Sequence, residues 1–280
     1  MIILAPAKVN LFLEVTGKRP DGYHNIESIM QAVSLYDRIV IKPGKGVITL
    51  KCSLKSLPAD NTNLALKAAI ALKNELKIDA SADIFLEKNI PLGAGLGGGS
   101  SDAAAVLKGL LKLWDKRISE KKLLAIAAKL GADVPFFIKG GTALARGVGE
   151  RLKALKGVKR ARILLVNPGF GISTKSVYEN LHFPLTKKQK INRILGLLKA
   201  PSSPEVWGKL MFNRLEEAVL GNYPELCRIK AVFEANGCPS LMSGSGATVF
   251  GLVSKKKTEE KIRLEFDRSG WKCWTVETVV

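Results

Sequence analysis

Alternating apolar and polar positions predict β-strands in the first half of the chain. Between residues 3 and 15 the odd positions are apolar, whereas Lys8 and Asn10 fall on the other face. A repeat of two residues is typical of a strand with one buried face. Glycine, proline and aspartate at 17–22 form a turn signal that ends this strand. Similar patterns predict further strands over 26–42, 47–54 and 82–89.

Capping residues and prolines predict helices between and after these strands. Candidate N-caps open three helices: Asn61 or Asn63 before 64–77, Ser100 at the start of 100–114, and Ser119 before a helix that ends at Gly131. Two prolines are placed to open later helices, Pro204 and Pro224. The remaining strands are predicted within 141–155 and over 161–166 and 247–253. This mixed order predicts an α+β fold with largely antiparallel sheets.

Length and charge suggest the domain number and the class of partner. The 280 residues are enough for about two domains, and the basic stretch 153–160 divides them into 1–155 and 156–280. The formal net charge is +19, which suits anionic partners such as nucleotides, phosphates or RNA. The lysines, however, are spread in ones and twos, with short runs only at 187–190 and 255–257, as on an ordinary solvated surface.

Cysteine usage and hydropathy indicate a cytoplasmic protein. The four cysteines lack CxxC spacing and there are only two histidines, so a structural zinc site is not expected. Scattered cysteines in a chain with a full-sized core predict free thiols in a reducing compartment. No apolar stretch is long enough to cross a bilayer, and the apolar first residues lack the basic region of a signal peptide.

The segment Pro-Leu-Gly-Ala-Gly-Leu-Gly-Gly-Gly-Ser-Ser at 91–101 carries the strongest chemical signal. Five glycines in seven positions let a backbone adopt positive φ and approach a ligand closely. The predicted helix that follows would direct its unpaired N–H groups and its positive dipole end at the same place. The two features together predict a site for a polyphosphate. A flexible turn before a capped helix is the simpler alternative.

Three familiar phosphate-binding classes do not fit this segment. No Gly-Lys-Ser or Gly-Lys-Thr follows the glycines, so it is not a Walker A loop. Residues 93–98 match G-x-G-x-x-G, but the preceding strand alternates, whereas the first strand of a dinucleotide fold should be apolar on both faces. The His-Arg-Asp and Asp-Phe-Gly motifs of protein kinases are missing from the sequence.

Five segments in order along the chain resemble the GHMP kinases, which phosphorylate small molecules and are unrelated to protein kinases. They are APAKVNL at 5–11, RPDGYH at 19–24, the glycine-rich segment at 91–101, GADVPFF at 131–137 and LMSGSGATVF at 241–250. The stretch 185–205 matches no motif that we can place. The glycine-rich segment alone implies only the superfamily, whereas the Lys8/Asn10 and Tyr23/His24 pairs resemble one branch of it.

This resemblance implies a fold, a reaction and a substrate. The fold would be that of a two-domain GHMP kinase, with a ribosomal-protein-S5-like N-terminal domain, a ferredoxin-like C-terminal domain and the active site between them. The reaction would be ATP-dependent phosphorylation of an alcohol, with Mg²⁺ accompanying the ATP. In the resembling branch the acceptor is a small alcohol joined to cytidine diphosphate, phosphorylated at its 2-hydroxyl in the non-mevalonate route to isoprenoid precursors. Neither a nucleic acid nor a membrane is expected as a partner, and the oligomeric state stays open.

The resemblance also assigns roles to individual residues. Asp133 would be the catalytic base, and Lys8 would lie beside it and stabilise charge on the transferring group. Tyr23 and Tyr178 would stack on the cytosine, His24 would contact its edge, and Asn10 would bind acceptor hydroxyls. The loop at 243–246 would narrow the cleft near the acceptor phosphates. The ATP-binding residues would be Pro91, Leu92, Gly93, Ala94, Gly95, Leu96, Gly97, Gly98, Gly99, Ser100 and Ser101.

Simpler or different interpretations remain for these residues. Lys8 could be a solvated strand lysine, Asp133 a turn residue, His24 a surface histidine and Tyr178 a packing residue, while His182 is taken as structural. Another GHMP kinase acting on mevalonate or homoserine is a second hypothesis. A basic RNA-binding protein is a third, which explains the charge but gives the glycine-rich segment no role.

Overall fold

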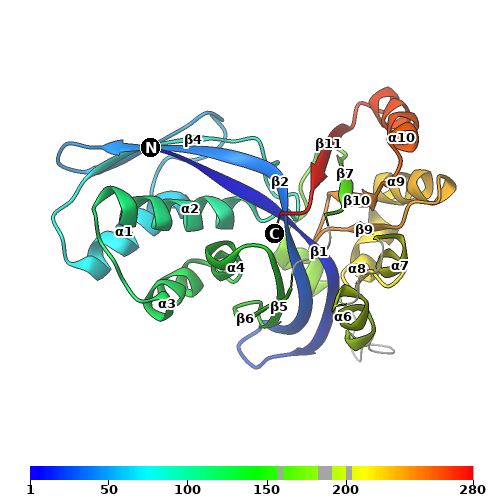
Figure 1. Cartoon of the computed structure of the whole chain (residues 1–280), viewed down its shortest axis with the longest axis horizontal. Helices are drawn as coiled ribbons and strands as arrows, with labels where there is room; N and C mark the ends of the chain where they lie inside the picture. Colours follow the sequence, from blue (N-terminus) through cyan, green and yellow to red (C-terminus); the bar gives the residue numbers. More distant parts are fainter. Residues whose placement is uncertain (157–159, 182–190, 200–203, 280) are drawn as a thin grey trace. The chain divides into compact units, whose positions relative to one another are not determined.

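The computed structural model describes residues 1–156, 160–181, 191–199 and 204–279 (Figure 1). Its chain packs as two compact units, each built from separate stretches of sequence. Unit 1 comprises Met1–Ala7, Leu35–Pro91 and Gly97–Lys139, and unit 2 comprises Lys8–Ser34, Leu92–Leu96 and Gly140–Val280. Strands β1 (Ile2–Lys18) and β2 (His24–Pro43) contribute to both units. The predicted boundary after residue 155 stays a prediction, as does His182, which lies outside the described residues.

Unit 1 places helices on one face of a sheet, as the left part of Figure 1 shows. Strand β4 (Ala82–Glu87) pairs antiparallel with β2 and parallel with β3 (Ile48–Cys52). The helices are α1 (Leu64–Leu76), α2 (Gly98–Leu113), α3 (Glu120–Leu130) and α4 (Val134–Lys139). A Cβ at Gly109 of α2 would lie 2.2 Å from Ile3 and 2.6 Å from Ile41, so this glycine lets α2 pack closely on β1 and β2.

Unit 2 contains the remaining strands. Strand β5 (Thr142–Gly147) pairs antiparallel with β2 and with β6 (Arg151–Ala154), and β8 (Phe212–Asn213) lies parallel to β1. A second sheet has the order β11 (Lys272–Glu277), β7 (Arg162–Asn167), β10 (Val249–Leu252), β9 (Ser240–Met242), with all its pairs antiparallel.

Helices α9 (Pro224–Ala235) and α10 (Lys256–Arg268) pack against this second sheet. Their buried rings, Phe233 and Phe266, join the apolar side chains of β7 and β10 in one core. Gly251 on β10 leaves room for the Phe233 ring, since a Cβ there would lie 2.2 Å from it. The shorter helices of unit 2 are α5 (Thr174–Glu179), α6 (Asn192–Lys199), α7 (Pro204–Gly208), α8 (Glu216–Val219) and η1 (Leu220–Asn222).

Most predicted elements are confirmed, and two details are wrong. The Asn63 side chain caps α1, Ser119 caps α3, and Pro224 opens α9. The prediction of one buried face for β1 is wrong, because residues 7–15 are all buried. Their polar side chains are buried with partners: Glu14, for example, accepts two hydrogen bonds of 2.8 Å from Arg214.

The second error is the cap of α2, which begins at Gly98 with Gly97 as its N-cap rather than Ser100. Gly97 has a left-handed backbone and offers no side-chain cap. The helix therefore starts inside the glycine-rich segment.

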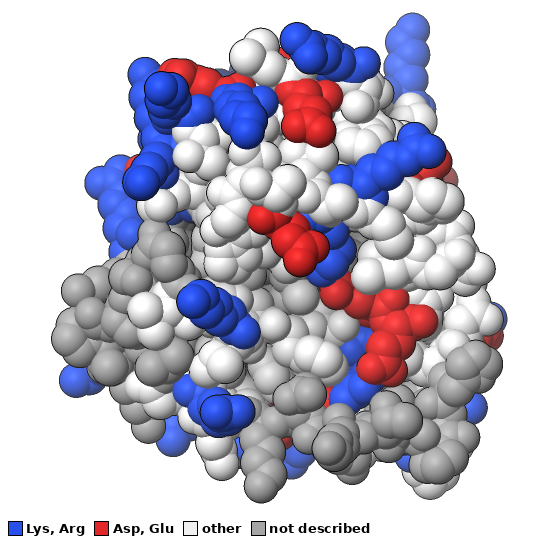
Figure 2. Space-filling model, turned by 90° about the vertical axis from the view of Figure 1, so that its right-hand side faces the viewer, with Lys and Arg blue, Asp and Glu red and all other residues white. Residues whose placement is uncertain are grey.

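The surface charge is mixed on the face that Figure 2 shows. Lys and Arg side chains stand there singly or in small groups, with Asp and Glu side chains among them. Cys52, Cys227, Cys238 and Cys273 are free thiols, as predicted. Among the described helices, none has the length and apolar character that a membrane span requires.

Candidate active site

The glycine-rich loop joins β4 to α2, and its middle residues belong to unit 2. Gly93, Gly95 and Gly97 have φ values of 61°, 73° and 71°, in the left-handed region. At Gly95 a Cβ would also lie 1.9 Å from the carbonyl oxygen of Ser243, so only glycine fits there. The buried side chains of Ala94 and Leu96 anchor the loop between these glycines.

Four consecutive carbonyl groups of the loop accept hydrogen bonds from unit 2. Backbone N–H groups donate to three of them: that of Ile172 to the Gly93 carbonyl, that of Thr248 to Ala94 and that of Lys8 to Leu96. The Gly95 carbonyl accepts from two side chains, the Lys8 ammonium and the Ser243 hydroxyl. The five distances lie between 2.8 and 3.3 Å. Because the protein already occupies these acceptors, a ligand facing the loop would meet amide N–H groups. An anion is the ligand that such a backbone suits.

In unit 1 the first turn of α2 also offers groups that suit an anion. The N–H groups of Gly98, Gly99 and Ser100 have no acceptor within the helix, and the positive end of the helix dipole lies there. Ser101 is 1% exposed, and its Oγ has no hydrogen-bond partner among the described residues. A buried hydroxyl of this kind can serve an oxygen-rich ligand bound at the helix start.

Lys8 is a buried lysine held by two fixed acceptors in unit 2. Its side chain donates to Asn10 Oδ1 at 2.6 Å and to the Gly95 carbonyl at 2.8 Å, and the residue is 4% exposed. Asn10 in turn donates through Nδ2 to Ser28 Oγ at 2.8 Å, and Ser28 donates to the Phe12 carbonyl. This chain of donors fixes the Asn10 amide so that its oxygen faces the Lys8 ammonium. Lys8 is therefore not a solvated strand lysine.

His24 and Tyr178 form a stacked pair in unit 2, with ring centroids 5.0 Å apart and an angle of 23° between the planes. Burial, together with the charge of Lys18, lowers the pKa of His24, so the imidazole is neutral at physiological pH. Tyr23 precedes His24 in the chain, but its side chain is 64% exposed in the turn before β2. The structure thus stacks His24 with Tyr178, while the neighbouring Tyr23 side chain is mostly exposed.

Asp133 lies in unit 1 in the short turn between α3 and α4 and is half-buried. Pro135 is the second residue of α4, so the chain becomes helical directly after Asp133. The turn lies near the first turn of α2: a Cβ at Gly131 would be 3.9 Å from Ser100 Oγ. Because Asp133 and Lys8 belong to different units, their joint action stays a prediction.

Comparison with known proteins identifies the family. The model of the GHMP kinases N-terminal domain matches residues 63–141, and that of the GHMP kinases C-terminal domain matches residues 194–272. A relative named 4-diphosphocytidyl-2-C-methyl-D-erythritol kinase from Clostridioides difficile is 45% identical over 90% of this chain and 86% of its own length. This chain belongs to the GHMP kinase family.

Further relatives of this GHMP kinase agree with that assignment. A protein of the same name from Carboxydothermus hydrogenoformans is 42% identical over 97% of this chain and 95% of its own length. A crystal structure of 4-(cytidine 5'-diphospho)-2C-methyl-D-erythritol kinase is 36% identical and superposes with a TM-score of 0.85 over 100% of both chains. Mevalonate kinase from Methanococcus jannaschii has a TM-score of 0.76 at 18% identity over 100% of this chain and 98% of its own, which shows a shared fold.

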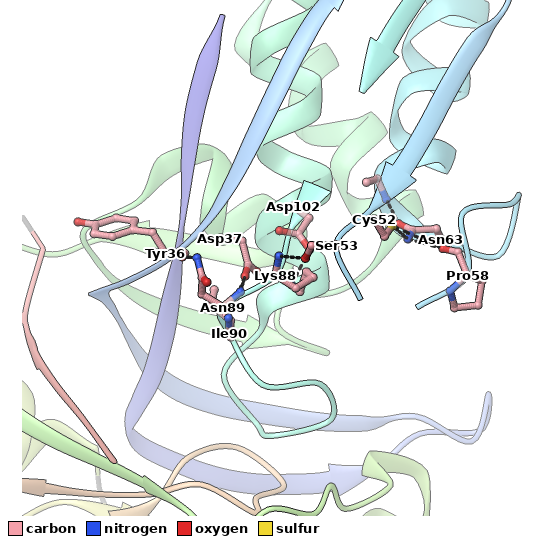
Figure 3. A network of polar contacts seen from close by, with 11 residues as sticks. Tyr36, Asp37, Cys52, Ser53, Pro58, Asn63, Lys88, Asn89, Ile90 and Asp102 are labelled. Atoms are coloured by element: carbon pink, nitrogen blue, oxygen red, sulfur yellow. Dashed lines mark hydrogen bonds and ion pairs between the residues drawn. The ribbon is translucent and has the colours of Figure 1, made fainter. Parts of the chain in front are cut away.

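The GHMP kinase chain also contains a buried ionic network that the sequence analysis missed. Figure 3 shows Lys88, just after β4, pointing between Asp37 of β2 and Asp102 of α2. Its ammonium contacts both carboxylates, and the three side chains are at most 3% exposed. One signal was available: Asp102 is the single charged residue in an otherwise uncharged run from Pro91 to Leu107.

Burial dominates the electrostatics of this network. It raises the pKa of the Asp102 carboxyl to about 7, with Lys88 opposing the shift and Asp37 adding to it. Asp102 Oδ2 accepts from Lys88 at 2.7 Å, whereas Oδ1 is buried with no hydrogen-bond partner among the described residues. Between about pH 4 and 7, the folded GHMP kinase therefore holds a proton at Asp102 that the unfolded chain has released.

This proton predicts a pH-dependent stability. The pKa of Asp102 is higher in the folded chain than in the unfolded chain. Its contribution to the free energy of unfolding is therefore complete below about pH 4 and is lost as the pH rises through about 7. Asp102→Asn should remove a slope of up to about 1.4 kcal/mol per pH unit in that window. Urea unfolding between pH 4 and 8 measures it, with Asp79→Asn as the control, since the Asp79 side chain is fully exposed. If the free energy of unfolding changes with pH by the same slope in wild type and in Asp102→Asn, the raised pKa of Asp102 is contradicted.

Proposed function

We propose that this chain transfers the γ-phosphoryl group of ATP to the 2-hydroxyl of 4-diphosphocytidyl-2-C-methyl-D-erythritol, a step of the non-mevalonate route to isoprenoid precursors. The observation that carries the proposal is the shared name of relatives that are 45% and 42% identical over most of their lengths. The structural relative with TM-score 0.85 bears the equivalent name at 36% identity. Mevalonate kinases reach only 18% identity, so they support the fold and not the acceptor.

ATP would bind through the glycine-rich loop. Its residues 93–96 have their carbonyl groups engaged by the protein, and the first turn of α2 adds N–H groups and a dipole. Among the described residues there is no cluster of three or more His, Cys, Asp or Glu that could hold a metal ion. Mg²⁺ would therefore arrive with the nucleotide and be bound largely through its phosphate oxygens.

Lys8 and Asp133 would serve the transfer step. Phosphoryl transfer needs mainly positioning and neutralisation of charge on the phosphoryl oxygens. The Lys8 ammonium, locked on Asn10 and Gly95, is suited to stabilise that charge without reorganising. Asp133 would accept the proton of the acceptor hydroxyl. Asn10 would then orient Lys8 in addition to binding an acceptor hydroxyl.

The cytidine half of the acceptor would bind at the His24–Tyr178 pair. The stacked rings offer an aromatic face for a pyrimidine, at about 1–3 kcal/mol per stacked base. A neutral His24 can both donate and accept at the edge of cytosine. Tyr23, exposed beside His24, would close on the base from the turn.

The proposal predicts selectivity for the cytidine-linked acceptor. Release of ADP should be fast with 4-diphosphocytidyl-2-C-methyl-D-erythritol and slower by a factor of roughly 10² or more with methylerythritol phosphate, which lacks the stacked base and its edge contacts. Mevalonate and homoserine serve as controls for other GHMP acceptors. Equal turnover of the two methylerythritol compounds would exclude a base pocket, and preference for a control would identify another GHMP kinase.

A second prediction concerns the coupling of Lys8 and Asp133. Asp133→Asn should slow single-turnover transfer by roughly 10²–10⁴, because it removes the proton acceptor. Lys8→Met should slow the same step and change ATP affinity much less, because the Ser243 hydroxyl still donates to the Gly95 carbonyl. The double variant should be little worse than the slower single variant, since residues that act as a unit are not additive.

The control for these variants is Asp115→Asn, an exposed aspartate after the other end of α2. It should keep the wild-type rate. A near-wild-type rate in Asp133→Asn would remove this residue from the mechanism, and multiplicative losses in the double variant would separate the two roles.

A further inference from the structure

The two ends of the glycine-rich loop meet at one buried lysine. Lys88 precedes the loop and Asp102 follows it in α2, and the Lys88 ammonium donates to Asp102 Oδ2 at 2.7 Å (Figure 3). The same ammonium donates to Asp37 Oδ2. All three residues belong to unit 1, so this bridge connects the two ends of the loop within one compact unit of the chain.

Asp37 fixes the upstream end of the loop through its second oxygen. Asp37 Oδ1 accepts the backbone N–H groups of Asn89 at 2.6 Å and Ile90 at 2.8 Å. The Asn89 side chain donates to the Tyr36 carbonyl at 3.0 Å, and the Lys88 N–H donates to Ser53 Oγ at 3.0 Å. Residues 88–90 are thus tied to β2 and to the segment after β3 before the chain enters the loop.

The downstream end of the loop contacts the same lysine, Lys88. A Cβ at Gly98 would lie 3.1 Å from Lys88 Nζ and 3.0 Å from Ile90 Cγ2, so the first residue of α2 packs directly against the bridge. Asp102, one turn further, holds the ammonium from the helix side. The Lys88 side chain therefore contacts both ends of the loop.

We propose that Lys88 is a positioning residue, which by bridging Asp37 and Asp102 sets the spacing of the loop ends and pre-orders the loop amides for the phosphates of ATP. This inference rests on the proposed function of the loop as the ATP site. Removing one partner of a buried ion pair is costlier than removing one partner of an exposed pair, so the bridge resists opening more than a surface ion pair would. A loop held in its binding geometry loses less entropy when the nucleotide binds.

The test uses a variant that removes the bridge without changing the formal charge of the cluster. At pH 8, where Asp102 is ionised, Lys88→Met together with Asp102→Asn takes away one positive and one negative charge and leaves Asp37 on its backbone partners. Asp102→Asn alone keeps an oxygen for Lys88 and should have the smaller effect. Lys108→Met is the matched control, because Lys108 is a lysine of the same helix whose ammonium donates to the Phe137 carbonyl, away from the loop.

Two measurements are made on the full chain. Hydrogen exchange without nucleotide should be roughly tenfold faster or more at residues 92–101 in the double variant, with α1 and β7 unchanged. ATP affinity from calorimetry should fall roughly ten- to a hundredfold in the double variant, as expected for a misplaced binding loop, and stay at the wild-type value in Lys108→Met.

The outcomes separate the inference from the proposed function. Wild-type protein that does not bind ATP contradicts the function itself. ATP binding by wild type with unchanged loop exchange in the double variant overturns the positioning role, even if affinity falls, because the loop would then keep its order without the bridge. Faster exchange throughout the chain would overturn it too, because the bridge would then stabilise the whole fold and not the loop. Lys88→Met alone is not used, since it leaves two buried carboxylates facing each other.

Discussion

The carbonyl groups of an anion-binding loop have to be turned away from the anion, and hydrogen bonds from the rest of the protein can hold them there. In this chain that constraint is met across residues 93–96, where amides, a hydroxyl and an ammonium donate to four successive carbonyls. The glycines are required by this arrangement. Gly95 admits the Ser243 carbonyl at a distance that no side chain would allow, and Gly97 turns the chain into α2 with a positive φ.

Two buried lysines complete the loop, and each illustrates the same physical chemistry. An ammonium in a protein interior is tolerated only with strong acceptors around it. Lys8 finds them in Asn10 and the loop itself, and Lys88 finds them in two aspartates at the base of the loop. In a GHMP kinase, both charges would support an ATP site. The Lys8 ammonium lies at the middle of the loop and is suited to stabilise charge on the transferred phosphoryl group, whereas Lys88 would set the shape of the loop.

Local patterns in the sequence predicted the parts of the fold that depend on local physics. The two-residue repeat predicted β1, and the same repeat predicted that Lys8 and Asn10 share a face, where they hydrogen-bond. The number of glycines predicted the loop. The network of Lys88, Asp37 and Asp102 was missed because its members are 51 and 14 positions apart, and no periodicity links such positions.

The errors have the same origin. Burial of both faces of β1 depends on elements far along the chain, such as Arg214 against Glu14. Ser100 has the chemistry of an N-cap, but the packing of Gly98 against Lys88 and Ile90 lets the helix begin earlier. The stacking of Tyr178 on His24, which no local pattern signals, likewise depends on tertiary packing. From the sequence, only the resemblance to GHMP kinases predicted that residues far apart in the chain, such as His24 and Tyr178, serve one site.

If the backbone geometry of the glycine-rich loop makes the ATP site, Gly97→Val should lose ATP binding, which calorimetric titration of ATP into the variant measures. Gly46→Val is the control, because Gly46 also has a positive φ, 78°, but lies in an exposed turn with open space around it. Both variants carry similar backbone strain, on the order of 1–3 kcal/mol. The account predicts that both fold, that Gly46→Val binds ATP like wild type and that Gly97→Val does not. Equal ATP affinity in the two folded variants would contradict it.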